Sequence, residues 1–386
     1  MTPVSILLDD LEITKHVYLT LDKNIGFAAD EFEFEIENSG ERYTDLFYDS
    51  AGEKLGIEFA GAITFAGQVD TADYNPLNPQ ILTVRGRDHT GKLCDSLLDQ
   101  AQIDRFTGKT DSQIVKLIGD SVSFPTDLSA TPRVWSEQSL FAPGASLWIA
   151  VVGLAKRNGF DAWVGPDKTI HFRKRELSTS PKRSYDAKRL AGVTVGTGEA
   201  ARPCKWNFIQ DKLLSRGLKV MVIGYDPKTK KGHKVTSKLL PEAPEAGAGT
   251  PSLLPSLPGR DTQQGRRPGE ISYTAAPSQR NSANYQIITV VDYSLDTKEK
   301  CMNRAEALLR EYSAGLITGS LFVPGDAELE VNDCIQITGC RIAERTGGKY
   351  YVVGLRHEHS AVRFATTIQF ASKVLTENLL TTEADL

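Results

Sequence analysis

The sequence has little cysteine and no long apolar run. Its 386 residues include five scattered cysteines without a C-x-x-C pair: Cys94, Cys204, Cys301, Cys334 and Cys340. No apolar stretch approaches the roughly 18 residues of a transmembrane helix. The opening stretch MTPVSILLDDLEITK lacks the basic segment and apolar core of a secretory signal. We therefore expect reduced thiols, no membrane insertion and synthesis in a host cytoplasm.

The sequence also lacks the final Ser or Thr of a phosphate-binding loop whose other positions it matches. The stretch GRDHTGK, 86–92, matches G-x-x-x-x-G-K and lies between a strand-like and a helix-like run. Such a loop needs Ser or Thr after the lysine to ligate Mg²⁺, and Leu93 stands there. Asp88, inside the loop, would repel phosphate. We interpret Gly86 and Gly91 as turn glycines and expect no nucleotide cofactor.

A strong overall charge is also absent, but local charges are strongly separated. The formal net charge is −4. Residues 1–80 hold 16 acidic and 4 basic side chains, whereas residues 171–238 hold 17 basic and 5 acidic ones. Complementary surfaces of this kind orient partners during association. The alternative is two unrelated solvated surfaces.

The first 90 residues contain several stretches in which apolar and polar residues alternate. In EFEFEIEN, 31–38, Phe32, Phe34 and Ile36 share one face and glutamates share the other, as in a half-buried strand. The stretches 16–22, 56–74 and 81–88 are similar. Hairpin turns between them indicate antiparallel pairing, so residues 1–90 predict a first β barrel.

The period changes at residue 91. Helical stripes at 110–122 and 144–159, followed by a hairpin, predict an α/β insertion over 91–185. Strands then return over 186–240 and 286–375, which predict a second barrel with a helix at 296–314. Residues 241–285 are rich in Pro, Gly, Ala and Ser and predict a flexible loop, and 376–386 form a tail. The fold class is β-rich α+β, with two antiparallel β barrels and an inserted small α/β domain.

Several residues invite a catalytic or metal-binding interpretation, and none has the context for it. Asp88 and His89 are sequence neighbours, so on an extended chain they point to opposite sides. His357 and His359 share a strand face, but two ligands are too few for a metal site. Cys204 lacks a nearby base. The tryptophans predict core packing: Trp135, Trp148, Trp163 and Trp206. We expect no catalytic, cofactor-binding or metal-binding residue.

The C-terminal region resembles phage baseplate hub proteins, the group of the Mu-type hub and the late-control D protein. The resemblance rests on the helix RAEALLREYSAG and the strands ITGSLFVPGDAELEVNDCIQITG and GGKYYVVGLRHEHSAVRFATTIQF. Its marked positions are Pro324, Gly325, Gly339, Gly348, Tyr350, Val352 and His357. The junction RGRDHTGKLCDS and the unit SLWIAVVGLAKRNGFDAWVGPDKTIHFRK are similar to the corresponding parts of Mu-type hubs.

This resemblance implies a structural role in a phage tail. Such hubs carry two tube-like barrels per chain and form a homotrimeric ring of pseudo-sixfold symmetry that connects the tail tube to the central spike. The implied partners are a second and third copy, the tail tube protein, the spike protein, other baseplate proteins and the tape measure protein, with DNA only in transit. The location is the virion. The alternatives are a tail-associated cell-wall hydrolase and a hexameric distal-tail or tube adaptor.

Overall fold

The chain folds into two compact units in the computed structural model. Unit 1 comprises Met1–Gln210 and Arg310–Lys373, and unit 2 comprises Asp211–Leu309 and Val374–Leu386. The structure describes residues 4–8, 11–13, 16–24, 28–45, 54–59, 62–131, 134, 141–158, 160–174, 180–210, 218–226, 229–239, 286–292, 295, 297–313, 317–345, 348–372 and 379–385. In these ranges no helix is both long and apolar enough to cross a membrane.

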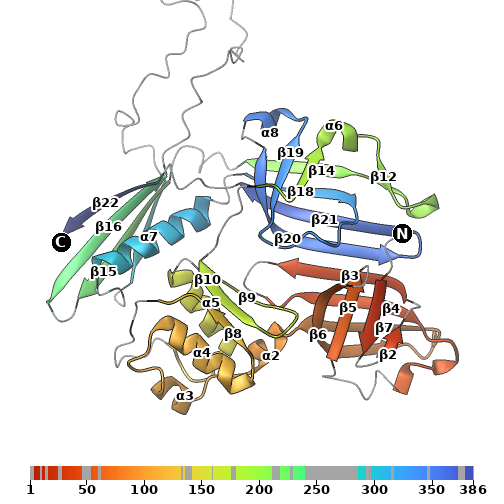
Figure 1. Cartoon of the computed structure of the whole chain (residues 1–386), viewed down its shortest axis with the longest axis horizontal. Helices are drawn as coiled ribbons and strands as arrows, with labels where there is room; N and C mark the ends of the chain where they lie inside the picture. Colours follow the sequence, from red (N-terminus) through yellow and green to blue (C-terminus); the bar gives the residue numbers. More distant parts are fainter. Residues whose placement is uncertain are drawn as a thin grey trace, which may run out of the picture. The chain divides into compact units, whose positions relative to one another are not determined.

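A 13-stranded sheet dominates unit 1 (Figure 1). Its main path is β14-β18-β21-β20-β3-β4-β7-β6-β5-β1-β2, with β19 paired to β20 and β11 paired to β19. The strands are β1 (Val4–Leu8), β2 (Leu11–Ile13), β3 (His16–Asn24), β4 (Glu31–Glu37), β5 (Lys54–Phe59), β6 (Ala62–Tyr74), β7 (Ile81–Asp88), β11 (Arg183–Asp186), β14 (Lys205–Gln210), β18 (Ile317–Pro324), β19 (Cys334–Thr338), β20 (Lys349–Ser360) and β21 (Arg363–Ser372).

Apolar alternation decides which side of each strand is buried. In β4, Phe32, Phe34 and Ile36 are at most 3 % exposed, and the intervening glutamates are partly or fully exposed. These side chains belong to a first core whose buried residues lie between Ile6 and Val84, with Ala327 and Phe364 packed against it. A second core gathers apolar residues between Ile317 and Phe370. The strands thus form because one face of each can be buried.

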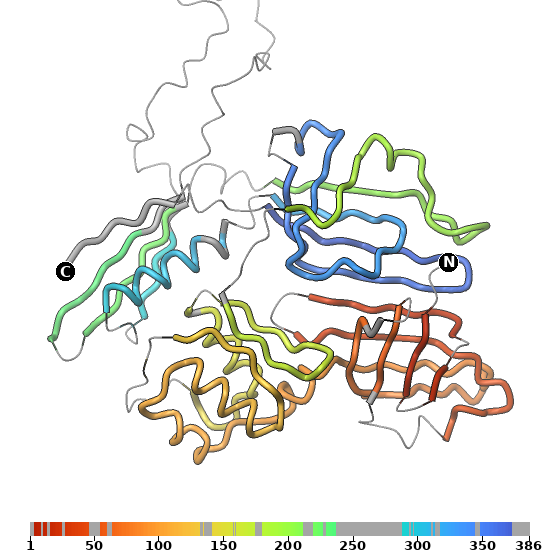
Figure 2. Tube along the Cα trace, in the orientation of Figure 1, coloured from red at the N-terminus to blue at the C-terminus, as the bar shows by residue number. Residues whose placement is uncertain are grey.

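The predicted division into two separate barrels is not confirmed. Strand β3, near the N-terminus, pairs with β20, near the C-terminus, from Asn24↔Gly354 to Tyr18↔Ser360. The two halves therefore share one continuous sheet, and Figure 2 shows their red and blue traces running side by side. Alternation along a strand predicts a buried face but not its neighbour, so the joining of the two halves was not predictable.

The boundaries of the predicted second barrel also differ from the observed division. Within 186–240 and 286–375, residues 211–240 and 286–309 belong to unit 2. The predicted tail 376–386 contributes a strand, β22 (Leu379–Asp385), to that unit. The predicted flexible loop, 241–285, lies outside the described residues. Strands of the two units have the same alternating pattern, so the sequence could not assign them to separate sheets.

The α/β insertion follows β7 directly. It contains α2 (Thr90–Asp95), α3 (Gln100–Asp104), α4 (Asp111–Val122), β8 (Thr126–Leu128), α5 (Leu147–Asn158), β9 (Phe160–Val164) and β10 (Ile170–Lys174). Capping boxes at Asp99 and Thr110 start α3 and α4. The three strands pair in the order β8-β10-β9, and a core of their own spans residues from Leu93 to Phe172.

In its described residues, unit 2 is a small sheet with one helix. Its strands β15 (Leu218–Asp226), β16 (Lys231–Leu239), β17 (Gln286–Val291) and β22 pair in the order β17-β15-β16-β22. Helix α7 (Lys298–Ser313), predicted at 296–314, buries Cys301, Ala305 and Leu309 in a core with Val220, Val222 and Val235.

The other short elements of the chain belong to unit 1. They are η1 (Ser39–Glu41), α6 (Ala187–Leu190), β12 (Thr194–Val195), η2 (Gly198–Ala200), β13 (Arg202–Pro203) and α8 (Arg341–Arg345).

Gly86 is not the turn glycine that we predicted. It lies inside β7, opposite Phe32 of β4 and Val69 of β6. A Cβ atom at this position would collide with the Gln68 carbonyl oxygen and with the Phe32 ring. The glycine therefore allows a close approach of two strands where β6 carries an irregularity between Val69 and Thr71.

Candidate functional site

Charged side chains share one face of the central strands of the sheet. On β3, β4, β7 and β20 this polar face consists of Asp22, Glu31, Glu33, Glu35, Glu37, Arg85, Arg87, Arg356 and Glu358. The register sets them in rows, one of which runs Thr367, Arg356, Asp22, Glu31 and Arg87. These six carboxylates and three guanidinium groups give the polar face an acidic surplus.

Ion pairs hold the polar face together across strands. Arg85 Nε lies 2.6 Å from Glu33 Oε2, and Arg87 bridges Asp70 at 2.6 Å and Asp95 at 2.8 Å. Arg356 lies 3.8 Å from Asp22 across the β3–β20 junction. Partial burial raises the pKa of Asp22, opposed by Arg356. Exposed pairs of this kind contribute about 0–1 kcal/mol each, so they organise the surface more than they stabilise the fold.

On the opposite face, histidines fill the β3–β20 junction. His16 Nε2 lies 2.8 Å from His359 Nδ1, and His357 Nδ1 lies 3.0 Å from Thr366 Oγ1. Phe59 of β5 and Phe364 of β21 stack beside them, with ring centroids 5.2 Å apart. Burial lowers the pKa of His16 to about 4 and that of His357 to about 3. The pair His357 and His359 thus lies in a packed junction rather than at an open strand end.

The other candidate residues take part in local structure. Asp88 lies where α2 begins, and its carboxyl group accepts hydrogen bonds from Thr90 N (3.1 Å) and Thr90 Oγ1 (2.7 Å). The His89 ring packs near Phe124, with centroids 6.2 Å apart, and burial lowers its pKa to about 4. Burial raises the pKa of the Cys204 thiol. Across the described ranges, no group of three or more His, Cys, Asp or Glu side chains could hold a metal ion.

The tryptophans occupy separate places. Trp148 is 2 % exposed in the core of the insertion. Trp163 stacks on His171, with centroids 4.6 Å apart, and Trp206 packs against the second core of the large sheet. Trp135 lies outside the described residues. Core packing thus describes Trp148 and in part Trp206, whereas Trp163 makes a stacking contact.

Lys92, the lysine of the apparent phosphate loop, is held by the protein itself. Its Nζ donates a hydrogen bond to the Val122 carbonyl at 3.2 Å, where α4 ends, and lies 5.4 Å from the centroid of the Phe124 ring. A lysine that caps a helix C-terminus stabilises its free carbonyl groups and the helix dipole. The geometry favours a structural role for this residue.

We therefore expect Lys92→Ala to lower the free energy of unfolding by about 1 kcal/mol, the sum expected for one hydrogen bond and a weak cation–π contact. Addition of ATP with Mg²⁺ should leave the melting temperature of both proteins unchanged. Differential scanning fluorimetry checks both statements. A thermal shift with ATP in the wild type that is lost in Lys92→Ala would restore the nucleotide hypothesis.

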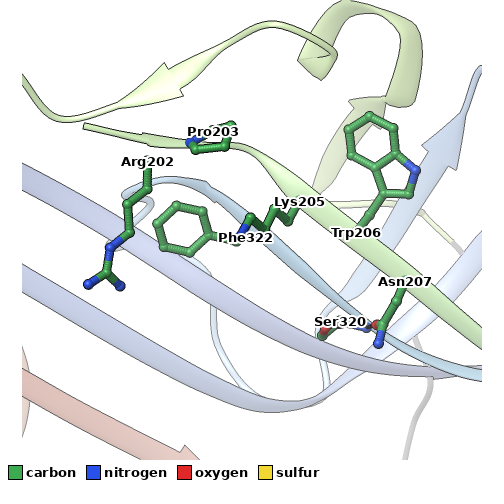
Figure 3. Close-up of a pocket in the computed structure, with 7 residues that line it drawn as sticks. All are labelled: Arg202, Pro203, Lys205, Trp206, Asn207, Ser320 and Phe322. Carbon is green, nitrogen blue, oxygen red and sulfur yellow. Dashed lines mark hydrogen bonds between the residues drawn. The ribbon is translucent and has the colours of Figure 1, made fainter. Parts of the chain in front are cut away.

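Strand β14, at one end of the sheet path, and the second part of β6 have strand edges that no other described strand pairs with. Strand β14 pairs only with β18. Strand β5 pairs with β6 from Ala62 to Gln68. The following part of β6, up to Tyr74, pairs with β7 alone. Beside β14 lies a groove of about 420 Å³, lined by Arg202, Pro203, Lys205, Trp206, Asn207, Ser320 and Phe322 (Figure 3). Neither the unpaired edges nor the groove was predicted from the sequence.

No protein-family model and no curated protein matches this chain, but solved structures do. A tail protein from Neisseria meningitidis matches with a TM-score of 0.63 and 15 % identity, covering 96 % of each chain. A 43 kDa tail protein of prophage MuSo2 from Shewanella oneidensis matches with a TM-score of 0.59 and 12 % identity over 96 % of each chain. This chain has the fold of phage tail proteins.

A third solved structure widens the comparison. The E. coli c3393 protein, a component of the type VI secretion system, matches with a TM-score of 0.50 and 9 % identity, covering 96 % of this chain and 77 % of that one. It is described as similar to the bacteriophage T4 tail proteins gp27 and gp5. The resemblance to baseplate hub proteins seen in the sequence is thus confirmed at the level of fold.

Proposed function

We propose that this protein is a baseplate hub, a structural ring that joins the tail tube to the central spike and encloses the channel for DNA. The observation that carries the proposal is the run of eight strands from β14 to β6, all antiparallel neighbours in one sheet. Two cores lie behind this run, one in each half of the sheet. Three copies would present six such halves, which matches a sixfold tube on one side and a threefold spike on the other.

The dimensions of such a ring suit a DNA channel. Three runs of eight strands supply 24 strands, which span about 115 Å at about 4.8 Å per strand. A closed circle of that length is about 37 Å across before the strands tilt, and tilting widens it further. This opening is wider than a DNA duplex, and the unpaired edges β14 and β6 are the places where copies would join.

The polar face is the surface that we assign to the channel wall. It is the only side of the eight-strand run without an apolar core among the described residues. Its surplus of carboxylates repels the phosphate backbone, so DNA would pass without binding. The proposed partners are the tail tube, the spike, other baseplate proteins and the tape measure protein, within the virion.

The separated charges seen in the sequence could also pair between neighbouring copies of the ring. Glu33, one of the acidic side chains of residues 1–80, is already paired with Arg85 of the same chain. Lys230 and Lys231, two lysines of the basic segment 171–238, belong to unit 2. Pairing of the acidic first half with the basic segment of the next copy remains a prediction. The acidic strands of the first half fit a channel wall instead.

The molecular mass in solution tests the proposed function. A trimer has a mass of about 127 kDa, three times the 42.3 kDa of one chain. We expect light scattering after size exclusion to give that mass and negative-stain top views to show a central hole. A hexameric ring would identify a distal-tail or tube adaptor instead. A monomer that degrades peptidoglycan would identify a cell-wall hydrolase.

A further inference from the structure

We propose that Leu77 of one copy inserts into the groove beside β14 of the next copy and so fixes the head-to-tail order of the ring. The loop that carries Leu77, residues 75–80, is called the knob, and the space around Pro203 and Phe322 is called the groove. This inference rests on the proposed ring and adds the residues that close it.

The knob presents one apolar side chain on a rigid support. Leu77 is 95 % exposed, the largest exposure among the described large apolar residues. Its backbone N–H donates to Asn75 Oδ1 at 2.9 Å. The fully buried Asn38 anchors the loop, because its Nδ2 donates to the Pro79 carbonyl at 3.2 Å and its backbone N–H donates to the Gln80 carbonyl at 2.6 Å. A pre-ordered loop loses little conformational entropy on binding.

The groove offers an apolar floor with a basic rim. Phe322 alternates with Leu321 and Val323, which both belong to the second core, so its ring lies on the other side of β18, in the row of Thr367 and Arg356 that continues the polar face. Arg202, Pro203 and Lys205 lie around that ring in Figure 3. A volume of about 420 Å³ lies in the range of roughly 300–1,000 Å³ that binding pockets show, so it admits a leucine side chain.

The sheet topology brings the two parts to the same level of a ring. Seven antiparallel pairings separate β14 from β6, so the two strands run in opposite directions. The end of β6 and the start of β14 therefore point to the same end of the sheet. The register sets Lys205 in one row with Gln68, which lies six residues, or about 20 Å, before Tyr74. The strands of a closed barrel tilt by about 35–45°, which displaces the two ends of an eight-strand row by a similar distance, about 20 Å, along the axis. Leu77 follows the end of β6, and Pro203 precedes the start of β14. When the β6 edge of one copy meets the β14 edge of the next, the knob faces the groove.

The charges around the two parts are complementary. Exposed carboxylates of Glu37, Glu41 and Asp73 surround the knob, against the single guanidinium of Arg42. Glu41 is fixed by the Tyr74 hydroxyl, which donates to its Oε1 at 3.1 Å. The rim of the groove carries Arg202 and Lys205 and no carboxylate. Opposite charges at a rim orient two copies before the apolar contact forms.

Two substitutions test the knob and the groove one at a time. Leu77→Asp should weaken self-association at least tenfold, and Phe322→Asp should do the same, as measured by sedimentation velocity over a concentration series. Ile149→Asp is the matched control, since Ile149 is 67 % exposed on α5 but belongs to neither part, and this variant should assemble as the wild type does. Unchanged melting temperatures would show that Leu77→Asp and Ile149→Asp are folded.

Mixing the two variants gives the decisive result. A Leu77→Asp copy keeps its groove and a Phe322→Asp copy keeps its knob, so one intact contact remains between them. We expect a 1:1 dimer of the two variants that does not close into a ring. If the wild type is a ring and neither variant alters it, the knob serves another partner and this inference is overturned. If the wild type stays monomeric at every concentration, the proposed hub function fails instead.

Discussion

Gly86→Ala is expected to destabilise unit 1 by more than about 3 kcal/mol, at the upper end of what overpacking costs. The added methyl group would meet the Gln68 carbonyl oxygen and the Phe32 ring, and neither can move without disturbing β6 or the first core. Urea unfolding followed by tryptophan fluorescence measures this effect. All tryptophans lie in Met1–Gln210, so the signal reports on unit 1 alone.

Gly153→Ala provides the matched control. Gly153 lies within α5, and nothing stands within 4 Å of the position of its added Cβ. The same chemical change should therefore stabilise the protein by about 0.5–1 kcal/mol, because alanine favours the helix. Equal effects of the two substitutions would show that β6 and β7 do not approach each other as described.

Asp88→Asn is expected to remove most of the pH dependence of unit 1 stability between pH 7.5 and 8.5. Burial, and secondarily the charge of Asp30, raises the pKa of Asp88 to about 8. Burial also raises the pKa of Asp30, to about 6. The folded state thus keeps a proton on Asp88 that the unfolded chain has already released, since a free Asp titrates near 3.9.

The sign follows from this difference in bound protons. Where the folded state binds more protons, stability falls as the pH rises, by at most about 1.4 kcal/mol per pH unit for one group. The buried histidines His16, His89 and His357 are neutral in the folded state, whereas a free histidine titrates near 6.5, so they make stability rise with pH up to about pH 7.5. Above that pH they are neutral in both states, and Asp88 dominates. We expect wild-type stability to decrease from pH 7.5 to 8.5 and the curve of Asp88→Asn to be nearly flat over that range.

Asp95→Asn serves as the control for this experiment. Asp95 is exposed, and its ion pair with Arg87 lowers its pKa, so it is ionised in both states over this range. Its curve should run parallel to that of the wild type, displaced by a constant amount. A curve for Asp88→Asn that also runs parallel to the wild type would contradict the assignment of the proton to Asp88.

Particular residues show how far the sequence predicted this molecule. The alternation of Phe32, Phe34 and Ile36 predicted both the strand and its buried side. The capped stripe from Asp111 to Val122 and the helix predicted at 296–314 formed as α4 and α7. Leu93, in place of a hydroxyl residue, argued against a phosphate loop, and the structure places Lys92 on a helix terminus. These features depend on neighbours in sequence, so local chemistry determined them.

Contacts between distant residues were decided only by the tertiary structure. The pairing of β3 with β20 joins residues more than 300 positions apart, and no local pattern specifies it. The same is true of the His16–His359 contact, of the groove beside β14 and of the separation of unit 2. By itself the sequence determined the strands, the helices and the acidity of the first half. Which strands pair, and hence which surface could line a channel, depends on burying apolar faces together, and that choice belongs to the folded chain as a whole.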